Sequence, residues 1–119
     1  MDAPAASVLV VEDDAALRMV CRVNLELDGF RVSEAATVDE ARAAVAGERP
    51  GLVLLDLHLA SGASDELLDE LRGAGIPVVL VSGTVDVAAY EGRASAVVPK
   101  PFEPAELVEL ARQHVAPVG

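Results

Sequence analysis

The sequence is poor in cysteine, in aromatic residues and in positive charge. Its single cysteine, Cys21, cannot form an intramolecular disulfide, and residues 1–7 lack the basic and apolar parts of a signal peptide, which predicts a cytoplasmic protein. Aromatic residues make up 3% of the chain and tryptophan is absent, which argues against flavin or base stacking. The formal net charge of -11 opposes binding to a phosphate backbone. We therefore expect no direct nucleic-acid partner.

Long apolar runs are missing as well. Every apolar run ends after a few residues at a charge, a glycine or a proline, far short of the roughly 20 residues that a membrane span requires. We therefore expect no membrane partner. The hydrophobic residues, 52% of a chain of 119, suffice for one core of ordinary size. The sequence predicts one domain over residues 1–119.

Short runs rich in valine and leucine recur along the chain. They cover residues 8–11, 52–55, 78–81 and 96–98, and residues 30–35 form a weaker fifth candidate. These runs are continuously apolar instead of alternating, which is typical of strands that are covered on both faces of a parallel sheet.

The first helix is expected before Gly29. Its mostly apolar stripe follows the i, i+3, i+4, i+7 spacing and consists of Leu17, Val20, Cys21, Asn24 and Leu27. We expect this stripe to face the core, with Cys21 as an inert buried thiol. Asp14 precedes this helix, so we favour a capping role for its side chain over a role in a site.

Three further helices and one short segment are expected downstream. Thr37 and Glu40 form a capping box for the second helix, and Ser64 is the candidate cap of the third. Pro104 suits the first position of the last helix, where its missing N–H costs nothing. Residues 86–93 leave room for a helix of about two turns at most. This alternation predicts an α/β fold with a five-stranded parallel sheet, helices on both faces and a short fourth helix.

Polar side chains stand where the predicted strands end. Glu12 and Asp13 follow the first strand, Asp56 the third, Ser82 the fourth and Lys100 the fifth. Ligands bind outside the carboxyl ends of the strands in such sheets. Clustered carboxylates repel one another unless a cation joins them, and an all-oxygen site suits Mg²⁺, with Mn²⁺ as an alternative. The sequence therefore predicts a divalent metal site.

Four motifs occupy these strand ends in the order VVEDD, VLLDLHL, VLVSGT and VPKPF. Together they make the chain resemble the receiver domain of two-component response regulators over nearly its whole length. The resemblance implies the flavodoxin-like strand order 2-1-3-4-5 and a single receiver domain without an output domain in this chain. It also implies a signalling module, not an enzyme, that accepts a phosphoryl group from a histidine kinase or a histidine phosphotransfer protein. An unknown downstream protein would read the result.

The resemblance also implies roles for individual residues. Asp56 matches the phosphoacceptor, and Lys100 and Ser82 match the groups that bind the phosphoryl oxygens. The Lys100–Pro101 bond is often cis in the family. The implied metal ligands are Glu12, Asp13, Asp56 and the backbone carbonyl of His58.

Three residues near these positions are expected to tune the lifetime of the phosphoryl group. The side chains of His58 and Thr84 match positions at which the family varies its rate of dephosphorylation. Gly83 stands where alanine is more usual, and the lost side-chain restraint should loosen the loop.

The chain departs from the family pattern around its switch. Ala60 and Ser64 replace a usual proline and glycine after Asp56, and Val97 replaces a usual tyrosine or phenylalanine. Tyr90 is a candidate replacement for that aromatic, although we favour a surface or packing role. These departures keep open a degenerate receiver that acts as a phosphorylation-independent protein-binding module.

Two alternatives from other classes fit the residues less well. A phosphohydrolase with an aspartyl nucleophile would need a second carboxylate two residues after Asp56, where His58 stands. A flavodoxin-like electron carrier would need a hydroxyl-rich loop after the first strand, and this loop is acidic.

Overall fold

The computed structural model describes residues 6–59, 64–83, 87–90 and 92–117. The strands are β1 Ser7–Val11, β2 Arg31–Ala35, β3 Leu52–Asp56, β4 Val78–Ser82 and β5 Ala96–Pro99. The helices are α1 Ala15–Leu27, α2 Val38–Gly47, α3 Ser64–Gly73, α4 Val87–Tyr90 and α5 Pro104–His114. All strand pairs are parallel, in the order β2-β1-β3-β4-β5. The predicted fold class, strand order and short fourth helix are confirmed.

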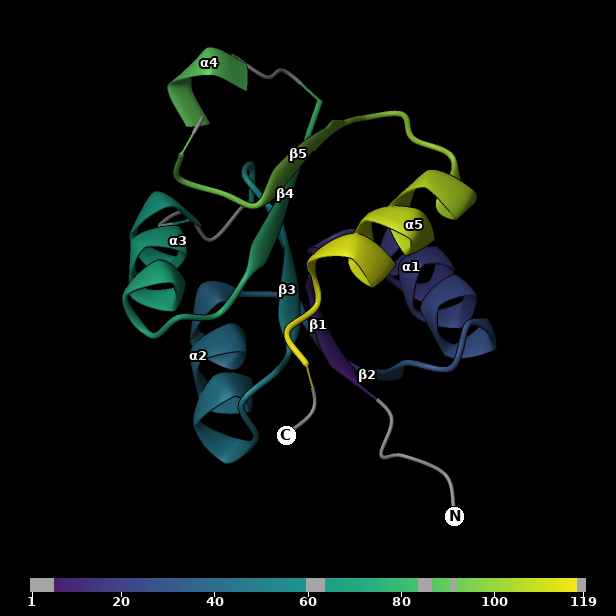
Figure 1. Cartoon of the computed structure of the whole chain (residues 1–119), viewed down its shortest axis with the longest axis horizontal. Coiled ribbons are helices and arrows are strands. Elements are labelled where there is room, and N and C mark those ends of the chain that lie inside the picture. The colour runs from purple at the N-terminus through teal and green to yellow at the C-terminus, as the bar shows by residue number, and fades with distance from the viewer. Residues whose placement is uncertain (1–5, 60–63, 84–86, 91, 118–119) are drawn as a thin grey trace.

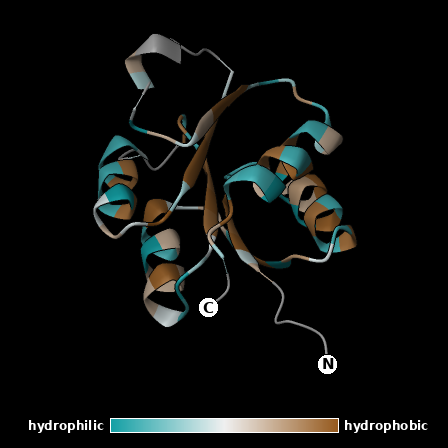
Figure 2. Cartoon of the chain, in the orientation of Figure 1, coloured by the Kyte–Doolittle hydropathy of each residue, from teal (hydrophilic) through white to brown (hydrophobic). Residues whose placement is uncertain are grey.

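The sheet separates two layers of helices. Helices α2 and α3 cover one face, and α1 and α5 cover the other (Figure 1). Alternate strand residues supply the two cores, so that Leu9 and Val53 pack towards α2 and α3 whereas Val8 and Leu52 pack towards α1 and α5. The central strands β1, β3 and β4 are accordingly the most hydrophobic part of the chain (Figure 2). Burial on both faces explains why their sequences do not alternate.

Helix α1 begins with a side-chain cap, as expected. An Asp14 carboxylate oxygen accepts hydrogen bonds from the backbone N–H groups of Ala16 (3.0 Å) and Leu17 (3.2 Å). Asp14 therefore satisfies two N–H groups that have no partner within the helix. Its role is structural.

The apolar face predicted for α1 is wrong at two of its positions. Cys21 and Leu25 are buried, whereas Val20 is exposed and Leu27 is 81% exposed. At 3.6 residues per turn, Leu27 lies about 120° around the helix from Cys21, outside the arc that the sheet and α5 cover. Residues spaced at i, i+4 and i+8, among them Cys21 and Leu25, lie within that arc instead.

The other helix starts mostly follow the predictions. The Thr37 hydroxyl oxygen accepts from the Glu40 N–H (3.1 Å), and Glu40 Oε1 accepts from the Ala36 N–H (3.2 Å), one residue before the cap. Pro104 begins α5. In the part of the chain that the structure describes, no helix has the length and apolarity to span a membrane.

Candidate functional site

Three charged side chains meet at the carboxyl ends of β1, β3 and β5. The Lys100 ammonium donates to Glu12 Oε1 (2.8 Å) and to Asp56 Oδ2 (3.2 Å). Both carboxylates are buried, with 4% of each residue exposed, and Lys100 is the only lysine of the sequence. The carboxyl ends of parallel strands share one edge of the sheet, which brings residues 44 and 88 positions apart into contact.

Asp13 completes a group of three carboxylates. Glu12, Asp13 and Asp56 each offer an oxygen, and these oxygens lie within 4.8 Å of one another. Asp13 is exposed, so the group opens to solvent on one side. Such an all-oxygen donor set fits a hard divalent cation.

The two buried carboxylates differ in proton affinity. Burial, together with the neighbouring Asp56, raises the pKa of Glu12 to about 7. Burial opposes ionisation of Asp56 too, but hydrogen bonds with Glu12, the His58 N–H and Lys100 outweigh it and lower its pKa below the ordinary value. Without a metal, the pair therefore holds its proton on Glu12 and leaves Asp56 as the anion.

The proton on Glu12 predicts a specific pH dependence of stability. The folded protein binds this proton more tightly than the unfolded chain, whose glutamate titrates near 4.5. The stabilisation is therefore complete below pH 4.5 and is lost as the pH rises through about 7. At 1.36 kcal/mol per pKa unit, the full loss is at most about 3 kcal/mol.

Urea unfolding between pH 4.5 and 8, in a chelator, measures this loss. We expect Glu12→Gln to flatten the fall of the free energy of unfolding with pH. The surface variant Glu66→Gln should keep the wild-type slope. Identical slopes for wild type and Glu12→Gln would contradict the assignment of the proton to Glu12.

Ser82, Gly83 and His58 lie at or just after the carboxyl ends of β4 and β3. Ser82 is fully buried at the end of β4, and its carbonyl oxygen accepts from the Lys100 N–H (2.8 Å). The residues Gly83 and His58 are exposed. The Lys100–Pro101 peptide bond is cis. Two residues singled out from the sequence, Thr84 and Ala60, lie outside the described residues.

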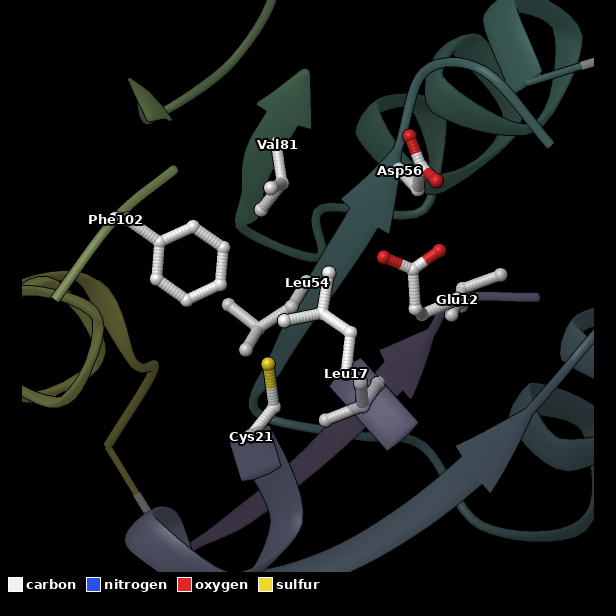
Figure 3. Close-up of a pocket in the computed structure, with 9 residues that line it drawn as sticks. Glu12, Leu17, Cys21, Leu54, Asp56, Val81 and Phe102 are labelled. Carbon is white, nitrogen blue, oxygen red and sulfur yellow. The ribbon is translucent and has the colours of Figure 1, made fainter. Parts of the chain in front are cut away.

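A small apolar pocket lies beneath the carboxylates. Its lining includes Cys21, Leu54 and Phe102, with Glu12 and Asp56 on the right in Figure 3. Burial, followed by the nearby Glu12 charge, raises the pKa of the Cys21 thiol to about 11. A thiol with so little thiolate is a poor nucleophile, in agreement with the predicted core role.

Two contacts of Asp56 were missed by the reasoning from sequence. The His58 N–H donates to Asp56 Oδ1 (2.9 Å), so the backbone of His58 already orients the carboxylate. Ser64 was expected to cap α3, and this is wrong. It is the first residue of α3, it is buried, and its hydroxyl donates to the Asp56 carbonyl oxygen (3.0 Å). The start of α3 faces the end of β3, so the Ser64 hydroxyl donates to a backbone carbonyl eight positions earlier in the chain and does not accept from the N–H groups of its own helix.

Comparison with known proteins identifies the class of protein that this fold and site define. Residues 8–112 match the response regulator receiver domain, and the chain belongs to this family of two-component systems. The receiver domain of NtrX from Brucella abortus is 30% identical with a TM-score of 0.83, and the match covers 90% of this chain and 96% of that one. A receiver domain protein from Methanospirillum hungatei is 28% identical with a TM-score of 0.85, over 92% of this chain and 93% of that one.

Two transcription regulators are among the similar curated proteins. The KDP operon transcriptional regulatory protein KdpE of Escherichia coli is 37% identical over 115 residues, which are 92% of this chain and 50% of that protein. The DNA-binding response regulator MtrA of Mycobacterium tuberculosis is 37% identical over 120 residues, 97% of this chain and 53% of that protein. The chain thus spans about half the length of the curated relatives that it matches.

The expectation that nucleic acid is excluded as a partner is wrong. MtrA is named as a DNA-binding response regulator, and KdpE as a transcriptional regulatory protein. The net charge of -11 describes only these 119 residues. Because the matched segment is about half of each relative, the charge of this segment excludes nothing about a DNA-binding region elsewhere in such proteins.

Proposed function

We propose that this chain is a phosphorylation-controlled receiver that accepts a phosphoryl group on Asp56 from a phosphohistidine. The donor would be a histidine kinase or a histidine phosphotransfer protein in the cytoplasm. The observation that carries the proposal is the buried Asp56 carboxylate, held as an anion with the only lysine ammonium of the chain 3.2 Å from its Oδ2 atom. Membership of the receiver family supports the same function.

The chemistry of the transfer suits these groups. A carboxylate oxygen of Asp56 forms a bond to phosphorus while the bond from phosphorus to the donor imidazole nitrogen breaks, and the electron pair leaves on that nitrogen. The product is a mixed anhydride. The attacking anion meets a negatively charged phosphoryl group, so the repulsion must be offset by positive charge that is already in place. Lys100 supplies it, and the Ser82 hydroxyl would bind a second phosphoryl oxygen.

A divalent cation would add to this charge compensation. Glu12, Asp13, Asp56 and the backbone carbonyl of His58 would hold Mg²⁺, or Mn²⁺, in the acidic group described above. The bound cation supplies electrostatic stabilisation of the transferring phosphoryl oxygens. The side chains of His58 and Thr84, with Gly83, would set how easily water reaches the anhydride afterwards.

The downstream effect would be the control of a DNA-binding activity. The names of the relatives support this direction, since MtrA is named as a DNA-binding response regulator and KdpE as a transcriptional regulatory protein. Phosphorylation adds nearly two negative charges and three strong acceptors beside Lys100 and Ser82. This change is enough to shift the equilibrium between two conformations of the surface.

Incubation with acetyl phosphate and Mg²⁺ tests the proposal. We expect the intact mass to increase by one phosphoryl group, and hydroxylamine to remove it because an acyl phosphate reacts with that nucleophile. A chelator should strongly reduce the uptake. If no phosphoryl group is taken up, the degenerate receiver that binds proteins without phosphorylation becomes the better description.

A further inference from the structure

A buried hydrogen bond joins the backbone of Asp56 to the start of α3. The Ser64 hydroxyl donates to the Asp56 carbonyl oxygen at 3.0 Å, and both residues are buried. Away from water such a bond has no competing partner, and losing it would leave a buried carbonyl without a donor. The first residue of α3 is thereby attached to the residue that carries the site.

The next residue along α3 contacts α4. The Tyr90 hydroxyl donates to Asp65 Oδ1 at 3.0 Å. The Arg93 guanidinium lies 3.8 Å from Asp65 Oδ1 and 3.2 Å from Asp69 Oδ1, and it also lies over the Tyr90 ring at 5.2 Å. A further α3 side chain, Arg72, donates to the Gly92 carbonyl oxygen at 2.7 Å. Side-chain contacts thus tie both Tyr90 and the turn after α4 to α3, which lies beside α4 in Figure 1.

Tyr90 also packs against the same core cluster as Val97, which stands where the family usually has an aromatic residue. The half-buried side chains of Tyr90, Ala94 and Val97 all pack against the core cluster that holds the buried face of α3. Valine at position 97 offers no hydroxyl and no ring. The aromatic group on this side of the sheet therefore comes from α4 and not from β5.

We propose that Ser64 is a positioning residue that couples Asp56 to Tyr90 through the first turn of α3. This inference rests on the proposed phosphorylation of Asp56. Ser64 and Asp65 are consecutive residues of one helix, so a displacement of the Asp56 backbone that pulls on Ser64 also moves the Asp65 carboxylate. Tyr90 and Arg93 then lose or change their partner, and the surface that α3 and α4 present to solvent changes with them.

Intrinsic fluorescence can follow this coupling at one residue. Tyr90 is the only tyrosine, and the chain has no tryptophan, so the emission of the protein is the emission of Tyr90. A phenol that donates to a carboxylate emits weakly, so a change in the Tyr90–Asp65 hydrogen bond changes the intensity. We expect phosphorylation by acetyl phosphate to change the emission of the wild-type protein, normalised to the phosphoryl content measured by intact mass.

Variants of Ser64 separate coupling from packing. We expect Ser64→Ala to take up the phosphoryl group and to lose the emission change. Ser64→Thr keeps the hydroxyl and should keep the response, and Ser33→Ala, on the exposed edge strand β2, should behave as wild type. Asp65→Ala removes the acceptor of the Tyr90 hydroxyl at an exposed position, and it should lose the response as well. A wild-type response per phosphoryl group in either Ser64→Ala or Asp65→Ala would overturn the coupling.

Titration of Tyr90 tests the coupling independently of phosphorylation. Burial and then the hydrogen bond to Asp65 raise the pKa of Tyr90 above its ordinary value. If Ser64 positions Asp65, the absorbance titration of Tyr90 should shift downwards in unphosphorylated Ser64→Ala. An unchanged midpoint would overturn the coupling. Absence of phosphoryl uptake by the wild type would instead overturn the proposed function, and this titration would still decide the role of Ser64.

Discussion

Replacing Asp56 by asparagine is expected to abolish phosphoryl uptake from acetyl phosphate. An amide nitrogen or oxygen is too weak a nucleophile to replace the carboxylate, whereas the shape of the side chain is kept. Metal-free Asp56→Asn loses the ion pair with Lys100 that helps to lower the pKa of Asp56, so we expect it to be folded and slightly less stable than the wild type. Intact mass after incubation with acetyl phosphate and Mg²⁺ measures the effect, and urea unfolding verifies the fold.

A neighbouring aspartate offers a matched control. Asp14→Asn makes the same chemical change close to the site, but Asp14 caps α1, and asparagine caps helices about equally well. We expect this variant to take up one phosphoryl group as the wild type does. A phosphoryl mass gain that persists in Asp56→Asn would show that another residue is the acceptor.

Replacing Lys100 by methionine is expected to slow phosphoryl uptake by about 10²- to 10³-fold, the usual effect of removing one pre-positioned donor from a charged transition state. Methionine keeps most of the length of the side chain without its charge. The ammonium contacts both Glu12 and Asp56, so its loss removes positive charge where the phosphoryl group would arrive. The initial rate of the phosphoryl mass gain at fixed acetyl phosphate and Mg²⁺ measures the effect.

The control for Lys100 must separate local charge from net charge. Arg49→Met also removes one positive charge, but Arg49 donates to the Ala74 carbonyl oxygen beside the amino ends of β3 and β4, away from the site. We expect its uptake rate to equal that of the wild type. Equal slowing in Arg49→Met and Lys100→Met would mean that Lys100 acts only through the net charge of the chain.

Much of the fold and of the site could be predicted because the relevant patterns are local. A continuous apolar run such as residues 52–55 is too short for a helix. It is also too apolar for a strand with one face exposed to water, so it indicates a buried parallel strand. Once the strands are parallel, the residues that follow them must share one edge of the sheet. The proximity of Asp56, Glu12 and Lys100 could therefore be predicted from the sequence.

Contacts that depend on how elements pack could not be predicted in the same way. The stripe on α1 allowed Leu27 to face inwards, and only the position of the helix against the sheet and α5 places Leu25 there instead. Ser64 has the residue type of a helix cap, yet its hydroxyl donates to the Asp56 carbonyl oxygen because α3 starts beside the end of β3. The Tyr90 hydroxyl likewise donates to Asp65, which lies on another helix.

Periodicity, composition and the residues at strand ends thus sufficed for the parallel sheet and the group around Asp56, whereas the strand order came from the resemblance to the receiver family. These features arise from interactions within a strand or helix and from the shared edge of a parallel sheet. The tertiary structure added the proton held by Glu12, the buried face of α1 and the link from Asp56 through Ser64 towards Tyr90. Those features depend on burial and on partners distant in the chain, which no local pattern of residues specifies.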